Sequence, residues 1–459
     1  MRDVLIFRPT IPQKRVSVYR SSQRRGPTRI GLIARWCYIR SCSIRTRRRN
    51  KLIVISGARL IDGTGAGPRE GMDVFVNDGE IVEVSPAGAR PVPNGAERID
   101  AGGMTLMPGL IDCHDHLSSF GYGLADKWGL TEPSSLRHMR IASVLEQTLH
   151  TGYTTVRDAG GLDAGFRTAV DEGLIPGPSL QVVLDVITPT GGIGDHASPS
   201  GYHHPAPPNP SLPDGVADGP DEMRHRVRQM ALAGANAIKT GTTGGASSRP
   251  GLGPKDTNMR PEELAALVDE AHSIGKRVMC HALGGPGLRV AIEAGVDSIE
   301  HGTHLDEDPD LVHMMVEKNI FYIPTFSVYI YHRAQGTPHG RARSEELTQH
   351  HIRSLELAME AGVKIVAGTD AGGWVHCNNA QEISCLAAAG MPPADALAAA
   401  TSRAAECLGI EGSVGTVEKG KRADLVLVDQ DPLADVSTLE KGASVRLVMK
   451  NGAVAVNRL

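Results

Sequence analysis

Two histidines one residue apart are the first sign of chemistry in this chain. His114 and His116 follow an apolar run within residues 107–117, which read MPGLIDCHDHL. Because side chains alternate between the two faces of a strand, both imidazoles would point the same way. Neutral imidazole is a good ligand for Zn²⁺. The pair alone could equally be two surface histidines at a strand end, so a metal site needs further ligands downstream.

Four residues of ligand type follow strand-like runs further along the chain: Lys239, His281, His301 and Asp370. Each has an ordinary alternative, such as a surface lysine or a structural histidine. Lys239, however, follows Ala-Ile in an apolar run, and burying an unpaired ammonium is costly. Reaction with CO₂ would convert this amine to a carbamate, an anion that can bridge two cations. Six such residues, each at a strand end, favour a shared site over coincidence.

The middle of the chain, residues 107–412, alternates strand-like and helix-like stretches. After the first strand, the predicted strands are 153–156, 180–187, 235–239, 277–281, 296–301, 320–325 and 363–370. Eight strand–helix repeats favour an α/β fold, the (β/α)₈ TIM barrel, whose active site lies at the C-terminal ends of the strands. Each of the six residues above would stand at such an end.

Both ends of the chain read as β structure. Strands are predicted at 51–60, 72–77, 80–84, 425–428, 445–450 and 453–456. Asp78-Gly79 and Asn451-Gly452 are hairpin-turn signals between the paired runs. These segments imply one small β-sandwich built from both chain ends. The predicted organisation is a basic extension (1–50), the N-terminal half of the sandwich (51–106), the barrel (107–412) and the C-terminal half of the sandwich (413–459).

The composition of the chain limits the classes of molecule that it is expected to bind. The formal charge of −4 over 459 residues gives no argument for nucleic acid or an anionic membrane. No apolar run approaches the roughly 20 residues that span a bilayer. Seven cysteines are an odd number for a disulfide framework, and Cys113 and Cys280 directly precede candidate ligands, which fits reduced thiols. We therefore expect a cytoplasmic homo-oligomer that acts on a small molecule.

The first 50 residues differ from the rest. They are rich in arginine and hold one acidic residue, Asp3. A transit peptide and a nucleic-acid-binding arm would both have this composition. The interpretation we favour is a disordered extension, translated from an upstream start, because a recognisable domain begins at Lys51. A secretory signal is disfavoured, since the apolar run 30–34 is short and is followed by more arginines.

Several motifs resemble the amidohydrolase superfamily. They are LIDGTG (60–65), MPGLIDCHDHL (107–117), IKTGTTGG (238–245), CHALG (280–284), IEHGTHLD (299–306), AGTDAG (367–372) and the passage 412–433. The resemblance covers residues 51–456 and is strongest to the imidazolonepropionase-like branch, which includes metal-dependent prolidases and an ochratoxin-hydrolysing amidase. It implies that His114, His116 and Asp370 bind one metal, that His281 and His301 bind the other, and that carboxylated Lys239 bridges them.

The implied cofactors are two divalent ions, with Zn²⁺ favoured and Co²⁺ or Mn²⁺ as alternatives, because such sites select weakly by affinity. Two cations that share a water lower its pKa towards neutrality. Asp370 would accept the water's proton and deliver it to the leaving nitrogen. One cation would polarise the scissile carbonyl.

Three functions remain open. The first is hydrolysis of the amide of an N-acyl amino acid or a dipeptide. The second is hydrolysis of cyclic amides, ureas or carbamates, including xenobiotics. The third is a catalytically silent barrel that serves in assembly, which an intact set of six ligands argues against.

Substrate recognition is harder to predict. The loop 190–201 reads TGGIGDHASPSG, in which Ile193 separates two glycines and His196 follows later. Related prolidases often carry a histidine two residues after Gly-Gly here, so this departure puts dipeptide specificity in doubt. His196 remains a candidate substrate contact. Arg249 could pair with a substrate carboxylate, and Arg157 and Tyr329 are further candidates, although each could be an ordinary loop or shell residue.

Removal of residues 1–50 should leave folding and catalysis intact, because the segment offers too few apolar groups to dock on a domain. A chain that starts near Lys51 should match the full chain in soluble yield, thermal midpoint and turnover when the two are measured side by side. An insoluble or inactive shortened chain would contradict this interpretation.

Overall fold

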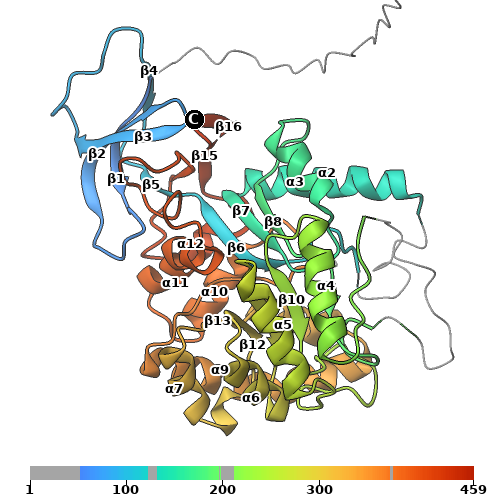
Figure 1. The fold of residues 1–459 in the computed structure, drawn as a ribbon. Helices are drawn as coiled ribbons and strands as arrows, with labels where there is room; N and C mark the ends of the chain where they lie inside the picture. Colours follow the sequence, from blue (N-terminus) through green and yellow to red (C-terminus); the bar gives the residue numbers. More distant parts are fainter. Residues whose placement is uncertain (1–51, 122–131, 196, 198–210, 373–375) are drawn as a thin grey trace, which may run out of the picture. The chain divides into compact units, whose positions relative to one another are not determined.

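A computed structural model describes residues 52–121, 132–195, 197, 211–372 and 376–459 (Figure 1). The predicted extension 1–50 and the candidate residue His196 lie outside these ranges. The described elements form a barrel with surrounding helices and a sheet built from both chain ends. Within the described ranges, helices that combine the length and the apolar character needed to cross a membrane are absent.

Parallel strands form the barrel. They are β6 (Leu110–Asp115), β7 (Tyr153–Asp158), β8 (Ser179–Val182), β9 (Val186–Ile187), β10 (Ile238–Gly241), β11 (Val278–Ala282), β12 (Ser298–His301) and β13 (Phe321–Ile323). The pairing order is β6-β7-β8 in one group and β9-β10-β11-β12-β13 in the other. Residues 363–371 lie between β13 and β6 and connect the two groups. The predicted α/β barrel is confirmed.

Two predicted strands differ in detail. The run 180–187 is not one strand, because the chain turns at Leu184 (φ 76°) and divides it into β8 and β9. The run 363–370 is not a continuous strand either. It bridges to its neighbours at only two points, Ile365 with Tyr322 and Ala371 with Asp115.

Close approach explains the irregular eighth segment. A Cβ on Gly368 would lie 2.6 Å from the side chain of Ile323 and 2.7 Å from the Cβ of His114. Real Cβ atoms do not approach so closely, so only glycine lets this segment fit between β13 and β6. The amide of Ala367 donates to the carbonyl of Ala399 rather than to a barrel strand, which interrupts the ladder.

Helices cover the outside of the barrel through one large hydrophobic cluster. They are α2 (Ser134–His150), α3 (Ala164–Asp171), α4 (Pro220–Leu232), α5 (Pro261–Ser273), α6 (Gly285–Ala294), α7 (Asp310–Glu317), α8 (Phe326–Gln335), α9 (Pro338–Ala361), α10 (Ala380–Ala388), α11 (Pro393–Ala399) and α12 (Ser402–Leu408), with short 3₁₀ turns η1 (Leu305–Glu307) and η2 (Val436–Gly442). In α5, Leu264, Leu267, Val268 and Ala271 are buried at helical spacing. Proline at its start and Gly275 (φ 68°) after its end set its limits.

The two chain ends share one sheet, as predicted. Its strands are β1 (Ile53–Leu60), β2 (Arg69–Asn77), β3 (Glu80–Pro86), β4 (Glu97–Asp100), β5 (Thr105–Pro108), β14 (Leu425–Val428), β15 (Val445–Lys450) and β16 (Ala453–Asn457). The order is β16-β15-β14-β5-β1-β2-β3, with β4 also paired to β1, so the early and late strands lie side by side (Figure 1). The two predicted hairpin turns touch, because a Cβ on Gly452 would lie 2.5 Å from the Cα of Gly79. Strands from both chain ends contribute to one hydrophobic cluster in this sheet.

The described residues include five cysteines, all free thiols. Cys113 and Cys280 are buried, next to His114 and His281 in the chain. This agrees with the expectation of packed, reduced thiols.

Candidate functional site

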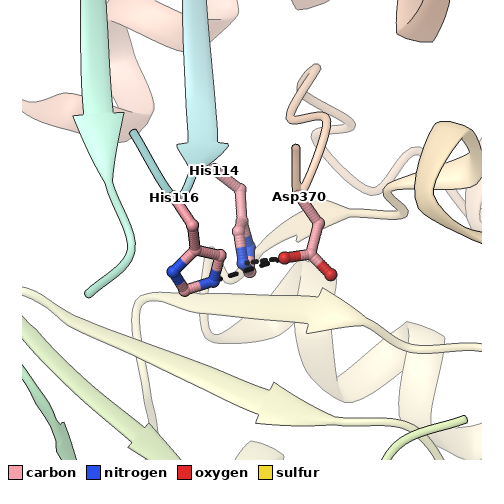
Figure 2. A group of neighbouring side chains, drawn as sticks. All are labelled: His114, His116 and Asp370. Atoms are coloured by element: carbon pink, nitrogen blue, oxygen red, sulfur yellow. Dashed lines mark ion pairs between the residues drawn. The ribbon is translucent and has the colours of Figure 1, made fainter. Parts of the chain in front are cut away.

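His114 and His116 lie at the C-terminal end of β6 and face Asp370 (Figure 2). Their Nε2 atoms are 3.4 and 3.3 Å from the same oxygen, Oδ1 of Asp370. Asp370 has a left-handed backbone (φ 52°), a conformation often found at functional sites. Although burial raises the pKa of Asp370, its hydrogen bond and charge interaction with His114 hold it well below the usual value.

The second nitrogen of each ring is bound to an acceptor. Nδ1 of His114 lies 2.6 Å from Oε2 of Glu300, and Nδ1 of His116 lies 2.9 Å from the carbonyl of Gly160. Burial raises the pKa of Glu300, but Arg157 and His114 outweigh it and lower this pKa to about 2, so the carboxylate cannot donate. Both Nδ1 atoms must therefore carry the hydrogen.

The position of the hydrogen on Nδ1 indicates whether the site suits a cation. In a neutral ring with hydrogen on Nδ1, the Nε2 lone pair is exposed, and here both Nε2 atoms face the anionic oxygen of Asp370. That arrangement is repulsive unless a positive charge lies between the rings and the carboxylate. Protonation of the rings or a divalent cation can provide the charge. The three residues form a group of metal-ligand type with all ligand atoms within 4.8 Å of one another.

His301 and His281 extend the site across β12 and β11. The ring centroid of His301 is 5.2 Å from that of His114 and 4.4 Å from that of His281. Nδ1 of His301 lies 2.7 Å from the hydroxyl of Thr325, whose hydrogen goes to a backbone carbonyl, which leaves Nε2 of His301 free. Nε2 of His281 lies 3.2 Å from the carbonyl of Gly244, which leaves Nδ1 free.

Both rings favour the neutral form that binds metals. Burial, together with the charge of nearby Lys239, lowers the pKa of His281 to about 3. Burial also lowers the pKa of His301 well below its usual value. His301, like Asp370, has a left-handed backbone (φ 74°). Four histidines therefore each hold one ring nitrogen against an acceptor and leave the other available.

Lys239 is buried on β10, close enough to His281 to affect the charge of that ring. The residue is 3% exposed, and its Nζ has no hydrogen-bond partner among the described residues. Burial lowers the pKa of Lys239, while the charges of Glu300 and Asp370 oppose this shift. Depression of the pKa favours the neutral amine, the form that reacts with CO₂. Lys239 does not end its strand as predicted, because β10 continues to Gly241.

Glu300 is a functional residue that the sequence reasoning missed. Besides His114, it accepts from Arg157 (3.2 Å) and from the hydroxyl of Ser298 (2.6 Å), all inside the barrel. Arg157, which was a candidate for substrate binding, also donates to the carbonyl of Cys113 at 2.7 Å. A glutamate in the apolar run Ser-Ile-Glu-His, directly before a candidate ligand, was the available signal.

Asn379 forms a second set of hydrogen bonds that holds β6 in place. The amide nitrogen of Asn379 is 2.7 Å from Asp112 and 2.9 Å from Asp115, which stand two residues before and one residue after His114 on β6. Asp112 also accepts from the backbone of His114 and from the hydroxyl of Thr369. Burial raises the pKa of both aspartates to about 7, and the Asn379 hydrogen bond opposes this. Asn379 thus positions the ligand pair without touching it.

The predicted substrate contacts lie in different settings. Arg249 is exposed and donates to the carbonyl of Gly191 at 2.7 Å, which joins the loops that follow β10 and β9. Tyr329, on α8, is buried with its ring centroid 6.2 Å from that of His301. His196 lies outside the described residues, so its position relative to the site stays a prediction.

Known proteins resemble this chain over most of its length. The model of the amidohydrolase family matches residues 105–455, and the chain belongs to this family. Ochratoxinase from Aspergillus niger is 32% identical over 371 residues, which cover 76% of this chain and 75% of that protein. The chain is thus a hydrolase of carbon–nitrogen bonds, and the predicted relationship is confirmed.

Solved structures give the same family. A prolidase complexed with N-methylphosphonate-L-proline matches with a TM-score of 0.81 and 33% identity, covering 89% of this chain and 100% of that one. A Xaa-Pro dipeptidase with methionine bound in its active site matches with a TM-score of 0.79 and 30% identity, covering 88% of this chain and 99% of that one.

Replacement of Asn379 by alanine should destabilise the protein by about 2–3 kcal/mol, because two buried carboxylates lose their shared donor. Its neighbour Asn378 is a matched control. Asn378 is also buried. Its carbonyl oxygen accepts from the amide of Lys441, and its amide nitrogen reaches one carboxylate, that of half-buried Glu440, only at 3.5 Å. Asn378→Ala should cost about 1 kcal/mol. Denaturant unfolding of both variants measures the difference, and equal losses would contradict the positioning role of Asn379.

Proposed function

We propose that this chain is a metal-dependent amidohydrolase with a two-metal centre. The proposed ligands are His114, His116, His281, His301, Asp370 and a CO₂-derived carbamate on Lys239. One observation carries the proposal: four histidines leave one ring nitrogen each free around Asp370, beside a buried lysine amine without a partner among the described residues. Zn²⁺ fits these nitrogen and oxygen donors, and Co²⁺ or Mn²⁺ could replace it.

The chemistry divides between cations and protein. When bound, divalent cations lower the pKa of water and polarise a carbonyl oxygen. Asp370 is ionised, and it is placed to accept a proton from the attacking water and to pass it to the leaving nitrogen. Glu300 holds the ring of His114 in one orientation through a 2.6 Å hydrogen bond. The pair Arg157–Glu300 keeps that carboxylate charged inside the barrel.

The proposed substrate is the amide of an N-acyl amino acid or a dipeptide. The similar proteins support this, since one is an ochratoxinase, one is a prolidase holding a proline derivative, and one is a dipeptidase holding methionine. Proline and methionine derivatives of this kind carry a carboxylate. Arg249 offers an exposed guanidinium on the loop after β10, a suitable partner for such a group.

Lys239→Ala should lose bound metal and nearly all activity, because the bridging anion is gone. Lys239→Arg should not rescue either, since a guanidinium stays protonated and cannot form a carbamate. Metal analysis of the purified variants, beside their thermal midpoints, separates loss of the bridge from loss of folding. Added bicarbonate or short carboxylates should restore some metal and activity to Lys239→Ala. A Lys239→Ala variant that is folded, active and binds as much metal as the wild type would refute the two-metal proposal.

A substrate screen tests the bond that is cleaved. The metal-loaded enzyme should hydrolyse N-acyl amino acids or dipeptides in preference to hydantoin-like rings and aryl ureas. Arg249→Met should raise KM for a substrate with a free carboxylate by up to about fivefold, the worth of an exposed ion pair, and leave KM for its amide unchanged. Turnover of rings or ureas alone would refute the amidase proposal. Equal KM changes for acid and amide would reject the role of Arg249.

A further inference from the structure

A second cluster of ligand-type side chains lies between η1 and α9, apart from the Asp370 centre. It consists of His304, directly before η1, Glu307, at the end of η1, and His350, on α9. One ligand atom from each lies within 4.8 Å of the others. We propose that these residues bind a divalent transition-metal cation and so fasten α9 to the loop that follows His301.

The histidines present free nitrogens. Nδ1 of His304 lies 2.8 Å from the hydroxyl of Thr303, which can itself donate to the carbonyl of Leu283 at 3.5 Å. Nδ1 of His350 lies 2.9 Å from a carboxylate oxygen of Asp306. A carboxylate behind a histidine is the usual arrangement that orients metal-ligating imidazoles. With hydrogen on both Nδ1 atoms, each ring has Nε2 left to bind a cation.

The contact between Arg353 and His350 still leaves Nε2 of His350 without a hydrogen. Arg353 approaches Nδ1 of His350 at 3.2 Å, but it also donates to Asp306 at 2.9 Å. The anionic Asp306 is the nearer partner of Nδ1, so the hydrogen stays between them. The side chain of Asp306 is only 7% exposed, which strengthens this pairing.

The two rings also lie side by side. The centroids of His304 and His350 are 4.8 Å apart with an interplanar angle of 25°. Two protonated rings stacked in this way would repel each other, so the stack disfavours a positive charge on both rings at once. Burial lowers the pKa of His304 in agreement with this. One ring nitrogen of each histidine lies within 4.8 Å of the other, close enough for a single cation to reach both.

The carboxylate already has a partner. Both oxygens of Glu307 contact the ammonium of Lys255, at 2.9 and 3.2 Å. The side chain of Lys255 is 52% exposed and can turn into solvent when a cation arrives. Lys255 therefore competes with the metal for Glu307, and its removal should tighten metal binding.

The donor set defines the class of cation. Two imidazole nitrogens and one carboxylate suit Zn²⁺, Co²⁺, Ni²⁺ or Cu²⁺, whereas Mg²⁺ and Ca²⁺ prefer oxygen ligands. Three protein ligands leave further positions for water.

Equilibrium dialysis of the full-length, metal-loaded enzyme against buffered Zn²⁺ tests the site by stoichiometry, independently of activity. The wild type should bind one more equivalent than His350→Ala or Glu307→Gln, and thermal midpoints report whether the variants fold. Added Zn²⁺ should raise the midpoint of the wild type but not of these variants. Lys255→Gln should tighten binding of the additional equivalent by up to about fivefold, the worth of an exposed ion pair.

Glu307→Gln keeps the shape of the side chain, so it decides the matter if His350→Ala unfolds. The same metal content in the wild type and in Glu307→Gln would overturn the proposal. Weaker binding of the additional equivalent by Lys255→Gln would overturn it as well, because the ammonium would then assist the cation rather than compete with it.

Discussion

Closure of the barrel depends on the buried carboxylate of Asp112. It accepts from the backbone of His114 at 2.9 Å, from the backbone and hydroxyl of Thr369 at 3.3 and 2.8 Å, and from Asn379 at 2.7 Å. These donors come from the first strand, from the irregular eighth segment and from the chain just before α10. Each of its two oxygens accepts two of these hydrogen bonds, a capacity that a side-chain amide or hydroxyl lacks. Asp112 therefore brings His114 and Asp370 together.

Hydrogen bonds to fixed partners also orient the histidines of the site. Each of the four candidate histidines has one ring nitrogen bound to an acceptor. The acceptors are one carboxylate, two backbone carbonyls and one hydroxyl. These acceptors choose the tautomer, and burial keeps the rings of His281 and His301 neutral. The barrel thus holds the proposed donor atoms in one orientation and one tautomer without a cation. Such preparation lowers the cost of organising a site when the ion binds.

The fold and the residues of ligand type could be predicted because their signals are local. Strand–helix alternation requires only the apolar pattern of neighbouring residues, and His114-x-His116 lies on one face of a strand by geometry alone. Supporting residues were harder to find. Asn379 lies 264 residues from Asp115 and belongs to no motif, so only the folded chain shows that they meet.

The irregularities of the backbone could not be predicted from the sequence either. Leu184 adopts a left-handed conformation that leucine rarely takes, and nothing in its neighbours indicates a break in the strand. The eighth segment reads as a strand in its apolar pattern, yet steric closeness at Gly368 and the diverted amide of Ala367 decide its path. Both effects depend on tertiary neighbours, which a local pattern does not contain.

The shared sheet has a consequence for the order in which the protein can assemble. β5 joins β6, and hence His114, through Gly109 alone, and its partner on one side is β14, near the end of the chain. During synthesis, β5 must wait for almost all of the barrel to be made before β14 exists. Pairings between such distant segments form slowly, because a long loop has to close first. A strand that is made after the barrel therefore completes the support of the first strand of the barrel, and a chain that terminates before β14 leaves β5 without this partner.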